Sequence, residues 1–370
     1  MSFWRMQQFL VIITSWLGGF GTCLLFFQYT LPDCLFQSVP SHLTPHFYPK
    51  TNSSSLQEVS QPEKPILLVW AWPETDNFKF DPIECKNRFG TDSCNLTDDR
   101  NLYTLSDAVL IYHKSIKNDL SSLPQTPRPS FQRWIWFNLE SPTNTRKKAG
   151  LENLFNLTLT YRRDSDISVR YDLTVRKRKY ENIVIPKKDK LVCWFVSNTN
   201  PGTGAWARIK YYEDLRKHIN VSIFGNMAGS RLKDEDYYPT MASCKFYLSF
   251  ENSIHKDYIT EKFNGPLAVG TVPIVLGTSR ENYEQFAPGD SFIHVNDFPS
   301  AELLAQHLFR LDKDDEAYRH YFDWRKHIST IPHYSVWNEE FILPICQACD
   351  YIARQREYKE VHDLFKWYFS

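Results

Sequence analysis

Short apolar runs separated by longer polar stretches recur along most of the chain. Runs rich in branched and aromatic side chains predict strands at Ile66–Trp70, Ala108–Tyr112, Arg133–Phe137 and Leu157–Tyr161. A second series of strands is predicted at Leu191–Val196, Val221–Phe224, Cys244–Phe250 and Val272–Leu276. Helices are predicted at Trp206–His218, Ala301–Leu311 and Glu316–His327. Strands separated by helix-length gaps favour parallel α/β sheets, here as two doubly wound domains that face each other across a cleft.

One polar interruption stands out, in the segment YLSFENSIHKDYITEK at Tyr247–Lys262. The apolar strand stops at Glu251-Asn252-Ser253, and charged and hydroxyl side chains fill the stretch up to a short predicted helix. Strand, polar segment, helix and strand form a βαβ unit, in which ligands bind outside the carboxyl ends of the strands. The segment therefore predicts a phosphate- or sugar-binding site.

The N-terminus predicts a membrane anchor. Phe9–Phe27 holds 19 residues without a charge, close to the ~20 that span a bilayer. Met1–Gln8 carries Arg5 alone, which agrees with a short cytoplasmic tail. We expect an uncleaved anchor, followed by a flexible stem rich in Pro, Ser and Thr up to Pro65; the alternative is a secreted protein with an unusual signal peptide.

Glycosylation sequons and cysteines also indicate a lumenal protein. Sequons, the acceptor signature for N-glycosylation, occur at Asn52, Asn95, Asn156 and Asn220. Beyond the anchor and the stem there are six cysteines, namely Cys85, Cys94, Cys193, Cys244, Cys346 and Cys349. An even number in an oxidising compartment favours structural disulfides, with the pairing open, over a zinc or redox half-site at Cys346-Gln-Ala-Cys349. Cys34 in the stem is either free or a link in a homodimer.

Composition excludes little but disfavours nucleic acid as a partner. Lys+Arg and Asp+Glu are both 43, so the chain has no net field. The basic stretch Arg176–Lys179 lacks interleaved aromatics, and we expect an interdomain linker there and not a nucleic-acid patch.

A metal is not expected to be essential. Asp164-Ser165-Asp166 resembles the Asp-X-Asp that chelates a divalent ion between phosphates, but Arg162-Arg163 precedes it and can neutralise both carboxylates. A diphosphate leaving group then needs fixed cations. Lys262 at the start of a predicted helix is one candidate, and Arg208 in the first crossover after Ser197-Asn198 is the other.

Glu140 is the candidate base. It follows the strand Arg133–Phe137 and precedes the Ser141-Pro142 turn, where an α/β domain presents a catalytic acid or base. The same pattern is also common in ordinary turns and helix caps.

Four motifs resemble the Golgi alpha-(1,3)-fucosyltransferases, glycosyltransferase family 10. They are FQRWIWFNLESPTN at 131–144, LTLTYRRDSDI at 157–167, KFYLSFENSIHKDYITEKF at 245–263 and VPIVLG at 272–277. The similarity extends from about Ile66 to the C-terminus. It implies a GT-B fold of two Rossmann-like domains and inverting transfer of L-fucose from GDP-fucose. The implied acceptor is the GlcNAc of type 2 lactosamine on glycoproteins and glycolipids, giving Lewis X-type epitopes.

The resemblance also implies roles for single residues. Glu140 falls at the family's general base, Arg208 and Lys262 would hold the diphosphate, and Glu261 would lie by the fucose. The full set of implied GDP-fucose contacts is Tyr171, Ser197, Asn198, Arg208, Tyr247, Asn252, Tyr258, Glu261 and Lys262. The implied disulfides are Cys85–Cys346, Cys94–Cys349 and Cys193–Cys244, and no metal or other cofactor is required.

Four features of the sequence bear on how far the family's residue roles apply to this chain. Thr199–Trp206 is longer than its counterpart, which affects the alignment of Arg208, and Gly265-Pro266 falls inside the predicted helix. Glu74–Phe80 is also longer, so no acceptor residue is carried over from it. Lys114 lies where an aromatic accompanies 1,4-transfer, and a cation there favours 1,3-transfer.

The expected organisation is a tail at 1–8, a transmembrane anchor at 9–27, a stem at 28–64, an acceptor domain at 65–182, a GDP-fucose domain at 190–345 and a segment at 346–370 tied to the acceptor domain. The expected location is the Golgi membrane, with the catalytic part in the lumen. The alternatives are a lumenal glycan-binding module without catalysis and a transferase for a different GDP-sugar.

Overall fold

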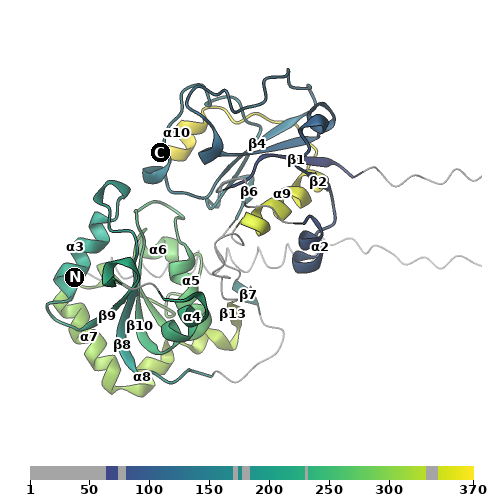
Figure 1. Ribbon diagram of the computed structural model, residues 1–370. Helices are drawn as coiled ribbons and strands as arrows, with labels where there is room; N and C mark the ends of the chain where they lie inside the picture. Colours follow the sequence, from purple (N-terminus) through teal and green to yellow (C-terminus); the bar gives the residue numbers. More distant parts are fainter. Residues whose placement is uncertain (1–63, 74–80, 170–173, 177–183, 230–231, 331–340) are drawn as a thin grey trace, which may run out of the picture. The chain divides into compact units, whose positions relative to one another are not determined.

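The fold is known from a computed structural model that describes residues 64–73, 81–169, 174–176, 184–229, 232–330 and 341–370 (Figure 1). All of them belong to the compact unit Gln61–Ser370. The expected anchor and stem, Asn52, Tyr171 and the longer stretch Glu74–Phe80 lie outside the described residues. Among the residues that are described, none of the helices combines the length and the apolar character needed to cross a membrane.

The first sheet is parallel and has six strands. They are β1 (Ile66–Ala71), β2 (Asn95–Thr97), β3 (Ala108–Tyr112), β4 (Arg133–Asn138), β5 (Leu157–Thr160) and β6 (Ile167–Ser168). Their order across the sheet is β2-β1-β3-β4-β5-β6. The residues of β3 and β4 are buried throughout, as expected for strands of a parallel sheet covered on both faces.

The second sheet is also parallel, with the doubly wound order β12-β11-β10-β8-β9. Its strands are β8 (Lys190–Phe195), β9 (Val221–Phe224), β10 (Cys244–Phe250), β11 (Val272–Leu276) and β12 (Ile293–His294). The order reverses between β8 and β10, and the carboxyl ends of two such strands are where an open α/β sheet binds its ligand.

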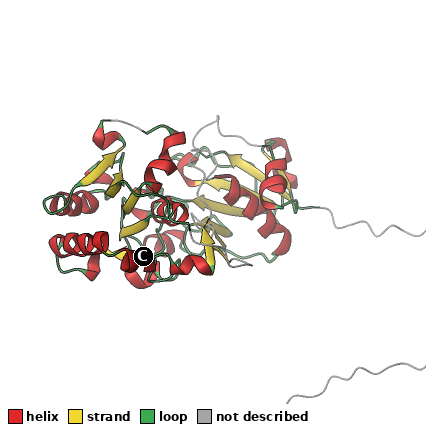
Figure 2. Cartoon of the chain, turned by 90° about the horizontal axis from the view of Figure 1, so that it is seen from below, coloured by secondary structure: helices red, strands yellow, loops and turns green. Residues whose placement is uncertain are grey.

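Helices cover both faces of the second sheet, as Figures 1 and 2 show. The helix α3 (Trp206–Leu215) contacts α7 (Ala301–Lys313), whereas α4 (Asp234–Ala242) contacts α5 (Glu261–Val269). In α7 the buried side chains Leu304, Leu308 and Leu311 repeat at helical spacing, which explains why this amphipathic sequence forms a helix. The remaining helices of this part are α6 (Arg280–Tyr283) and α8 (Asp315–His320).

The strands predicted from apolar runs are confirmed, with small shifts at their ends. Two helix predictions were too long: α3 ends at Leu215, and the stretch 316–327 divides into α8 and the 3-10 turn η7 (Asp323–Lys326). The helix α2 (Ile83–Phe89) was missed, and so was α4, whose interior proline Pro239 argues against a helix in the sequence. Helix α5 continues through Pro266 despite the cost of a proline beyond the first turn.

The C-terminal segment packs on the first sheet. Helix α9 (Ile342–Arg354) places Ile345 and Ile352 in one core cluster with Leu110 of β3 and Ile135 of β4. Helix α10 (Leu364–Phe369) places the Tyr368 ring 4.7 Å from that of Trp136.

The described residues form three disulfides, in the pairs that the family resemblance implies: Cys85–Cys346, Cys94–Cys349 and Cys193–Cys244. The first joins α2 to α9, and the second joins the residue before β2 to α9. The third joins β8 to the start of β10.

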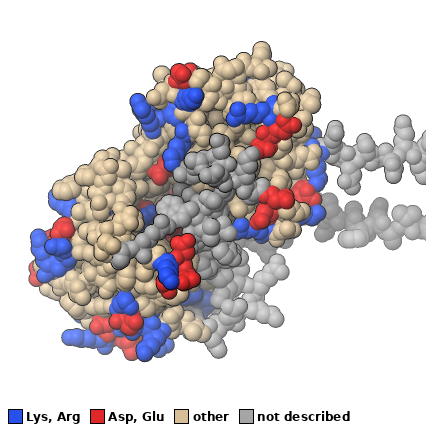
Figure 3. Space-filling view, in the orientation of Figure 1, with Lys and Arg blue, Asp and Glu red and all other residues tan. Residues whose placement is uncertain are grey.

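The first residue of the basic stretch predicted as a linker, Arg176, ends a strand, and 177–179 lie outside the described residues. The strand β7 (Thr174–Arg176) pairs antiparallel with β13 (Ile328–Thr330). Residues from two distant parts of the sequence meet here, a pairing that no local pattern indicates. On the face in Figure 3, basic and acidic side chains are interspersed, in keeping with the balanced composition.

Candidate active site

The polar segment that follows β10 turns back to start helix α5 at the reversal point of the second sheet. The Thr260 side chain caps this helix by accepting a hydrogen bond from the Lys262 N–H at 3.4 Å. The cap places Glu261 and Lys262 in the first turn, where backbone N–H groups and the helix dipole favour an anion. The expected βαβ unit is confirmed, because β10 and β11 pair in parallel.

A buried carboxylate lies beneath this turn. Glu251 is only 2% exposed, and its Oε1 accepts hydrogen bonds from the Thr260 N–H at 2.8 Å and from the Thr260 hydroxyl at 3.0 Å. The Lys262 ammonium lies 3.5 Å from Glu251 Oε2 and 2.9 Å from Glu261 Oε1. Glu251 was not among the residues that the sequence singled out for a role, although it follows a strand directly, as Glu140 nearly does.

The charged groups in this cluster shift one another's pKa values. Burial raises the pKa of Glu251, and the nearby Lys262 charge opposes the rise. Burial disfavours the Lys262 ammonium, but the carboxylates of Glu261 and Glu251 outweigh it and raise its pKa. Lys262 is therefore a fixed cation with 21% of its side chain exposed. Such a group can neutralise a phosphate without a metal.

Arg208 reaches the same place from α3 and is buried, unlike a typical helix-surface arginine. Its guanidinium donates to the backbone oxygens of Phe250, at 3.2 Å, and of Asn198. Its buried Nε has no partner among the described residues. Burial lowers the pKa of Arg208, and the negative charge of Glu251 opposes this change.

The loop before α3 is fitted closely against the segment after β10. Gly204 has a φ of +80°, and a Cβ there would lie 2.8 Å from the backbone oxygen of Asn252. A side chain at this position would push the two loops apart. The glycine thus allows the loop before α3 to approach the backbone of Asn252.

Tyr247 and Tyr258 line the inside of this region and are almost fully buried. Burial raises the pKa of the Tyr258 hydroxyl well above its usual value, and the carboxylates of Glu140 and Glu251 add to the rise. Tyr258 thus lies within electrostatic reach of both glutamates. Its ring also packs edge-on against Tyr161, at 5.0 Å between centroids.

Glu140 lies just beyond β4, with its side chain exposed and its backbone held. Its N–H donates to Asn138 Oδ1 at 3.4 Å, and its carbonyl oxygen accepts from the Tyr368 hydroxyl. One side-chain oxygen accepts from the Ser141 N–H at 3.3 Å. An exposed carboxylate on a fixed backbone is suited to meet a substrate hydroxyl.

Hydrogen bonds join the segment after β4 to the segment after β10. Ser253 Oγ lies 2.6 Å from Ser141 Oγ, and His255 Nε2 lies 2.7 Å from Thr143 Oγ1. The loop after β5 also contacts the segment after β10, because the Arg163 N–H donates to Asp257, which is 1% exposed, at 3.1 Å. The structure therefore brings the candidate base next to the candidate donor segment. These contacts could not be predicted from the sequence, since serine, threonine and histidine are common in loops.

The structure places the other candidate residues as follows. Ser197 and Asn198 are exposed at the end of β8, and Asn252 is half-buried. The sequon residues Asn95 and Asn220 are exposed. Asn156 is buried, and its Nδ2 donates to the Lys359 oxygen at 2.7 Å, a bond that a glycan on that nitrogen would displace.

The Asp-X-Asp carboxylates are engaged by the chain itself. Arg162 donates to both oxygens of Asp164, at 2.9 and 2.8 Å. Asp166 accepts from the N–H and hydroxyl of Thr158, at 2.8 and 2.9 Å, and from Lys359. In the part of the chain that the structure describes, no three or more His, Cys, Asp or Glu side chains are grouped to hold a metal ion.

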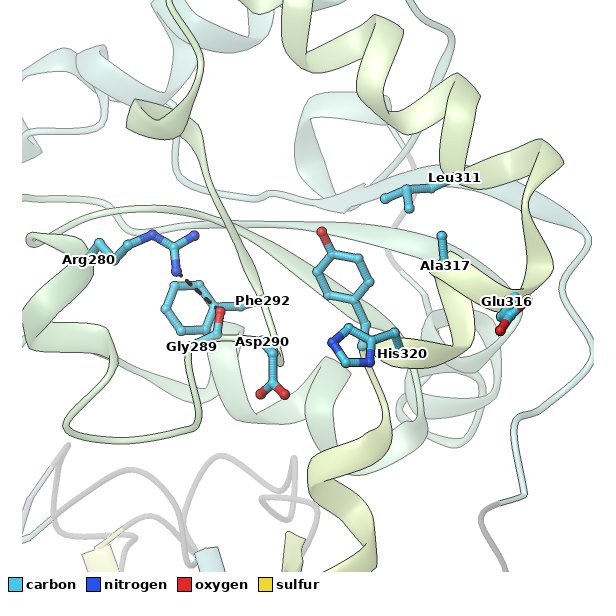
Figure 4. Close-up of a pocket in the computed structure, with 9 residues that line it drawn as sticks. Arg280, Gly289, Asp290, Phe292, Leu311, Glu316, Ala317 and His320 are labelled. Atoms are coloured by element: carbon cyan, nitrogen blue, oxygen red, sulfur yellow. Dashed lines mark hydrogen bonds between the residues drawn. The ribbon is translucent and has the colours of Figure 1, made fainter.

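A surface pocket beside α6, α7 and α8 is lined by none of the candidate site residues (Figure 4). Arg280 lies over the Phe292 ring on one side and donates to the Gly289 oxygen at 3.2 Å. The remaining lining residues are Asp290, Leu311, Glu316, Ala317, His320 and Tyr321. Arg280 is also paired with Asp297, and no residue predicted for the site lines this pocket.

Comparison with known proteins identifies the family. Residues 185–367 match the family described as glycosyltransferase family 10 (fucosyltransferase) C-term, and residues 62–172 match fucosyltransferase, N-terminal. The chain therefore belongs to glycosyltransferase family 10, the fucosyltransferases, and the family resemblance read from the four motifs is confirmed.

Three relatives share the name 4-galactosyl-N-acetylglucosaminide 3-alpha-L-fucosyltransferase 9. The Mus musculus protein is 46% identical over 370 residues, covering 99% of this chain and 98% of its own, and the Homo sapiens protein is 45% identical with the same coverage. The Bos taurus protein is 50% identical over 306 residues, or 82% of each chain. A solved structure of an alpha1,3-fucosyltransferase with GDP matches the fold with a TM-score of 0.50 at 17% identity, covering 84% of this chain and 96% of that one.

Proposed function

We propose that the chain transfers L-fucose from GDP-fucose, with inversion, to O3 of the GlcNAc in Galβ1-4GlcNAc on glycoproteins and glycolipids. The observation that carries the proposal is the convergence of Arg208 and Lys262 at the reversal point of the second sheet, with Glu140 on a segment hydrogen-bonded to the same region. Relatives over nearly the whole chain are named for this reaction on a 4-galactosyl-N-acetylglucosaminide.

The proposed donor site follows from the fixed charges. The GDP diphosphate lies between the Arg208 guanidinium, the Lys262 ammonium and the first N–H groups of α5, which stabilise the charge that develops on the leaving oxygen. Ser197, Asn198, Tyr171, Tyr247, Asn252 and Tyr258 complete the donor contacts, with Glu261 beside the fucose. In this arrangement Glu251 acts from below by holding Lys262.

The proposed chemistry is a single displacement. Glu140 accepts the proton of the acceptor 3-hydroxyl while that oxygen forms the bond to C1 of fucose, and GDP leaves with the bonding electrons on the opposite face. One displacement inverts the anomeric centre. General-base assistance of this kind contributes about 10²–10⁴-fold to the rate.

We further propose that the reaction needs no metal. Asp164 and Asp166 are already bonded to Arg162, Thr158 and Lys359, so they are poorly placed to chelate an ion. Lys262 and Arg208 supply the positive charge that a metal supplies elsewhere.

The remaining proposals concern specificity and location. The exposed Lys114, after β3, favours 1,3-transfer to type 2 chains. The GT-B arrangement, with the two sheets facing across a cleft, is proposed for the working enzyme. So are the anchor at 9–27, the Golgi lumen as the compartment and a homodimer.

The test is an activity screen of the purified chain against GDP-fucose and other GDP-sugars, with type 1, type 2 and sialylated acceptors. We expect fucose on type 2 lactosamine, with the 3-linkage established by NMR. Absence of GDP release with any acceptor would point to a glycan-binding module, and turnover of another GDP-sugar alone to a different transferase. Either result would overturn the proposal.

A further inference from the structure

Two side-chain pairs join the segment that carries Glu140 to the segment that carries the donor motif. These linking pairs are Ser141 with Ser253, at 2.6 Å between hydroxyl oxygens, and Thr143 with His255, at 2.7 Å between Oγ1 and Nε2. Ser141 and Thr143 are two residues apart on the first segment, and Ser253 and His255 are two residues apart on the second. The two segments are therefore joined at two successive points and not at a single chance contact.

The inner pair is shielded from water. Ser141 is 0% and Ser253 3% exposed, so each hydroxyl must find its partner within the protein. Loss of one hydroxyl would leave the other without this partner in a dry environment, where such a loss has its greatest effect. The outer pair is more open, since Thr143 is exposed.

The inner pair lies between a residue of the donor site and the base. Ser253 Oγ is also 3.2 Å from the side-chain oxygen of Asn252, which precedes it, and Ser141 directly follows Glu140. The single hydroxyl proton of Ser253 can serve one of these two acceptors at a time. A ligand that engages the Asn252 amide therefore changes the hydrogen bonding of Ser253, and through it that of Ser141.

We propose that the linking pairs position Glu140 in response to bound donor, so that the base is aligned when GDP-fucose occupies its site. The inference rests on the proposed function, since it assigns positioning roles to Ser141, Thr143, Ser253 and His255 in that reaction. None of the four touches the reacting atoms. They act through the backbone that carries Glu140.

A purely structural bond between the two segments makes a different prediction. The Arg163 N–H, on the loop after β5, also donates to Asp257 of the donor segment, so this segment stays bonded to a neighbouring loop of the first sheet without the linking pairs. Structural support alone would lower stability and leave the kinetic constants of the folded enzyme unchanged. A positioning role changes kcat and leaves donor affinity in place.

The kinetic test is a double-mutant cycle with Ser141→Ala, Ser253→Ala and both together. We expect each single variant to lose kcat by about fivefold to tenfold, as for one hydrogen bond, with the Kd for GDP by calorimetry unchanged. The double variant should be no slower than the slower single variant, because both remove the same bond. Ser253→Thr should restore activity by returning the hydroxyl.

The matched control is Leu303→Ala. Leu303 lies on α7, outside the candidate site, and is 41% exposed. We expect wild-type kcat and wild-type GDP affinity. Additive losses in the Ser141/Ser253 cycle, or single variants with wild-type kcat, would overturn the proposal.

A second measurement keeps the inference testable if transfer itself is not observed. Hydrogen exchange with GDP as the probe should show protection of residues 138–147 in the wild-type chain, and loss of that protection in the double variant while residues 250–262 stay protected. GDP that protects 250–262 but leaves 138–147 unchanged in the wild type would refute the coupling. An enzyme that binds GDP with this coupling but transfers no fucose would refute the proposed function and leave the coupling standing.

Discussion

Two glutamates follow buried parallel strands of this molecule and meet opposite environments. Glu140 follows β4 in the sequence Phe-Asn-Leu-Glu-Ser, and Glu251 follows β10 in Phe-Glu-Asn-Ser. Glu140 is exposed, with a backbone N–H as the partner of its side chain. Glu251 is 2% exposed and lies against Thr260 and Lys262.

The difference shows that position after a strand does not decide a carboxylate's role. A buried carboxylate beside a fixed cation forms an ion pair with that cation, and a substrate cannot reach it. An exposed carboxylate on a fixed backbone keeps its lone pairs for an incoming hydroxyl. One glutamate thus builds the site, and the other is available to act in it.

The largest expected effect is that of Glu140→Gln. The substitution keeps the shape and removes the base, so kcat should fall by about 10²–10⁴-fold. GDP affinity by calorimetry and the melting temperature should stay at wild-type values. Wild-type turnover in this variant would remove Glu140 from the mechanism.

Glu251→Gln should reverse the pattern. The amide keeps an acceptor for Thr260 but leaves Lys262 without one of its two carboxylates, so the free energy of unfolding should fall by about 2 kcal/mol. The loss of kcat should be about tenfold or less, and the measurement is chemical denaturation alongside steady-state kinetics.

Glu281→Gln on α6 is the matched control for this variant, because Glu281 is exposed. It should leave both quantities unchanged. A Glu251 variant with wild-type stability and a kcat loss as deep as that of Glu140→Gln would erase the distinction between the two glutamates.

Tyr368→Phe tests how the backbone of Glu140 is held. The variant removes the hydroxyl that donates to the Glu140 oxygen, and the loss of one such bond corresponds to about 1 kcal/mol, or roughly fivefold in kcat. Tyr358→Phe, at a residue that is 45% exposed, serves as the control. Equal kinetics for the two variants would show that the hydroxyl does not position the base.

The smallest effect is expected at Asp164, a third carboxylate that is paired within its own loop. Asp164→Asn should leave activity within about twofold, since its ion pair with Arg162 is largely exposed on the aspartate side. Wild-type activity should also persist in excess EDTA. Complete loss in EDTA that Mn²⁺ restores would return the Asp-X-Asp to a metal-binding role.

Much of this arrangement could be predicted from local sequence. The apolar runs predicted four strands of each sheet and missed only the short strands β2, β6 and β12. The rule that ligands bind at strand ends singled out Tyr247–Lys262 and Glu140. Lys262 was expected in the first turn of a helix, where it lies. These features depend on residues close together in the sequence.

The remainder depends on contacts between distant residues. Glu251 is buried against Thr260 at the start of α5, and Arg208 is buried where it donates to the backbone oxygens of Phe250 and Asn198. The hydroxyl that holds Glu140 comes from 228 residues further along the chain. No periodicity or composition reports such a partner, because it arises only when the sheets have formed.

Because α9 and α10 pack on the first sheet, this sheet cannot finish folding until the end of the chain has been synthesised. Cys85 and Cys94 leave the ribosome more than 250 residues before their partners Cys346 and Cys349. Domains usually fold from the N-terminus as they emerge, but here the first sheet stays uncovered until the final helices arrive. Tyr368 is among the last residues to be made, so the segment bearing Glu140 is completed after the second sheet. A nascent chain stopped shortly before its end would carry a formed second sheet and an exposed apolar face on the first, which makes it a substrate for chaperones.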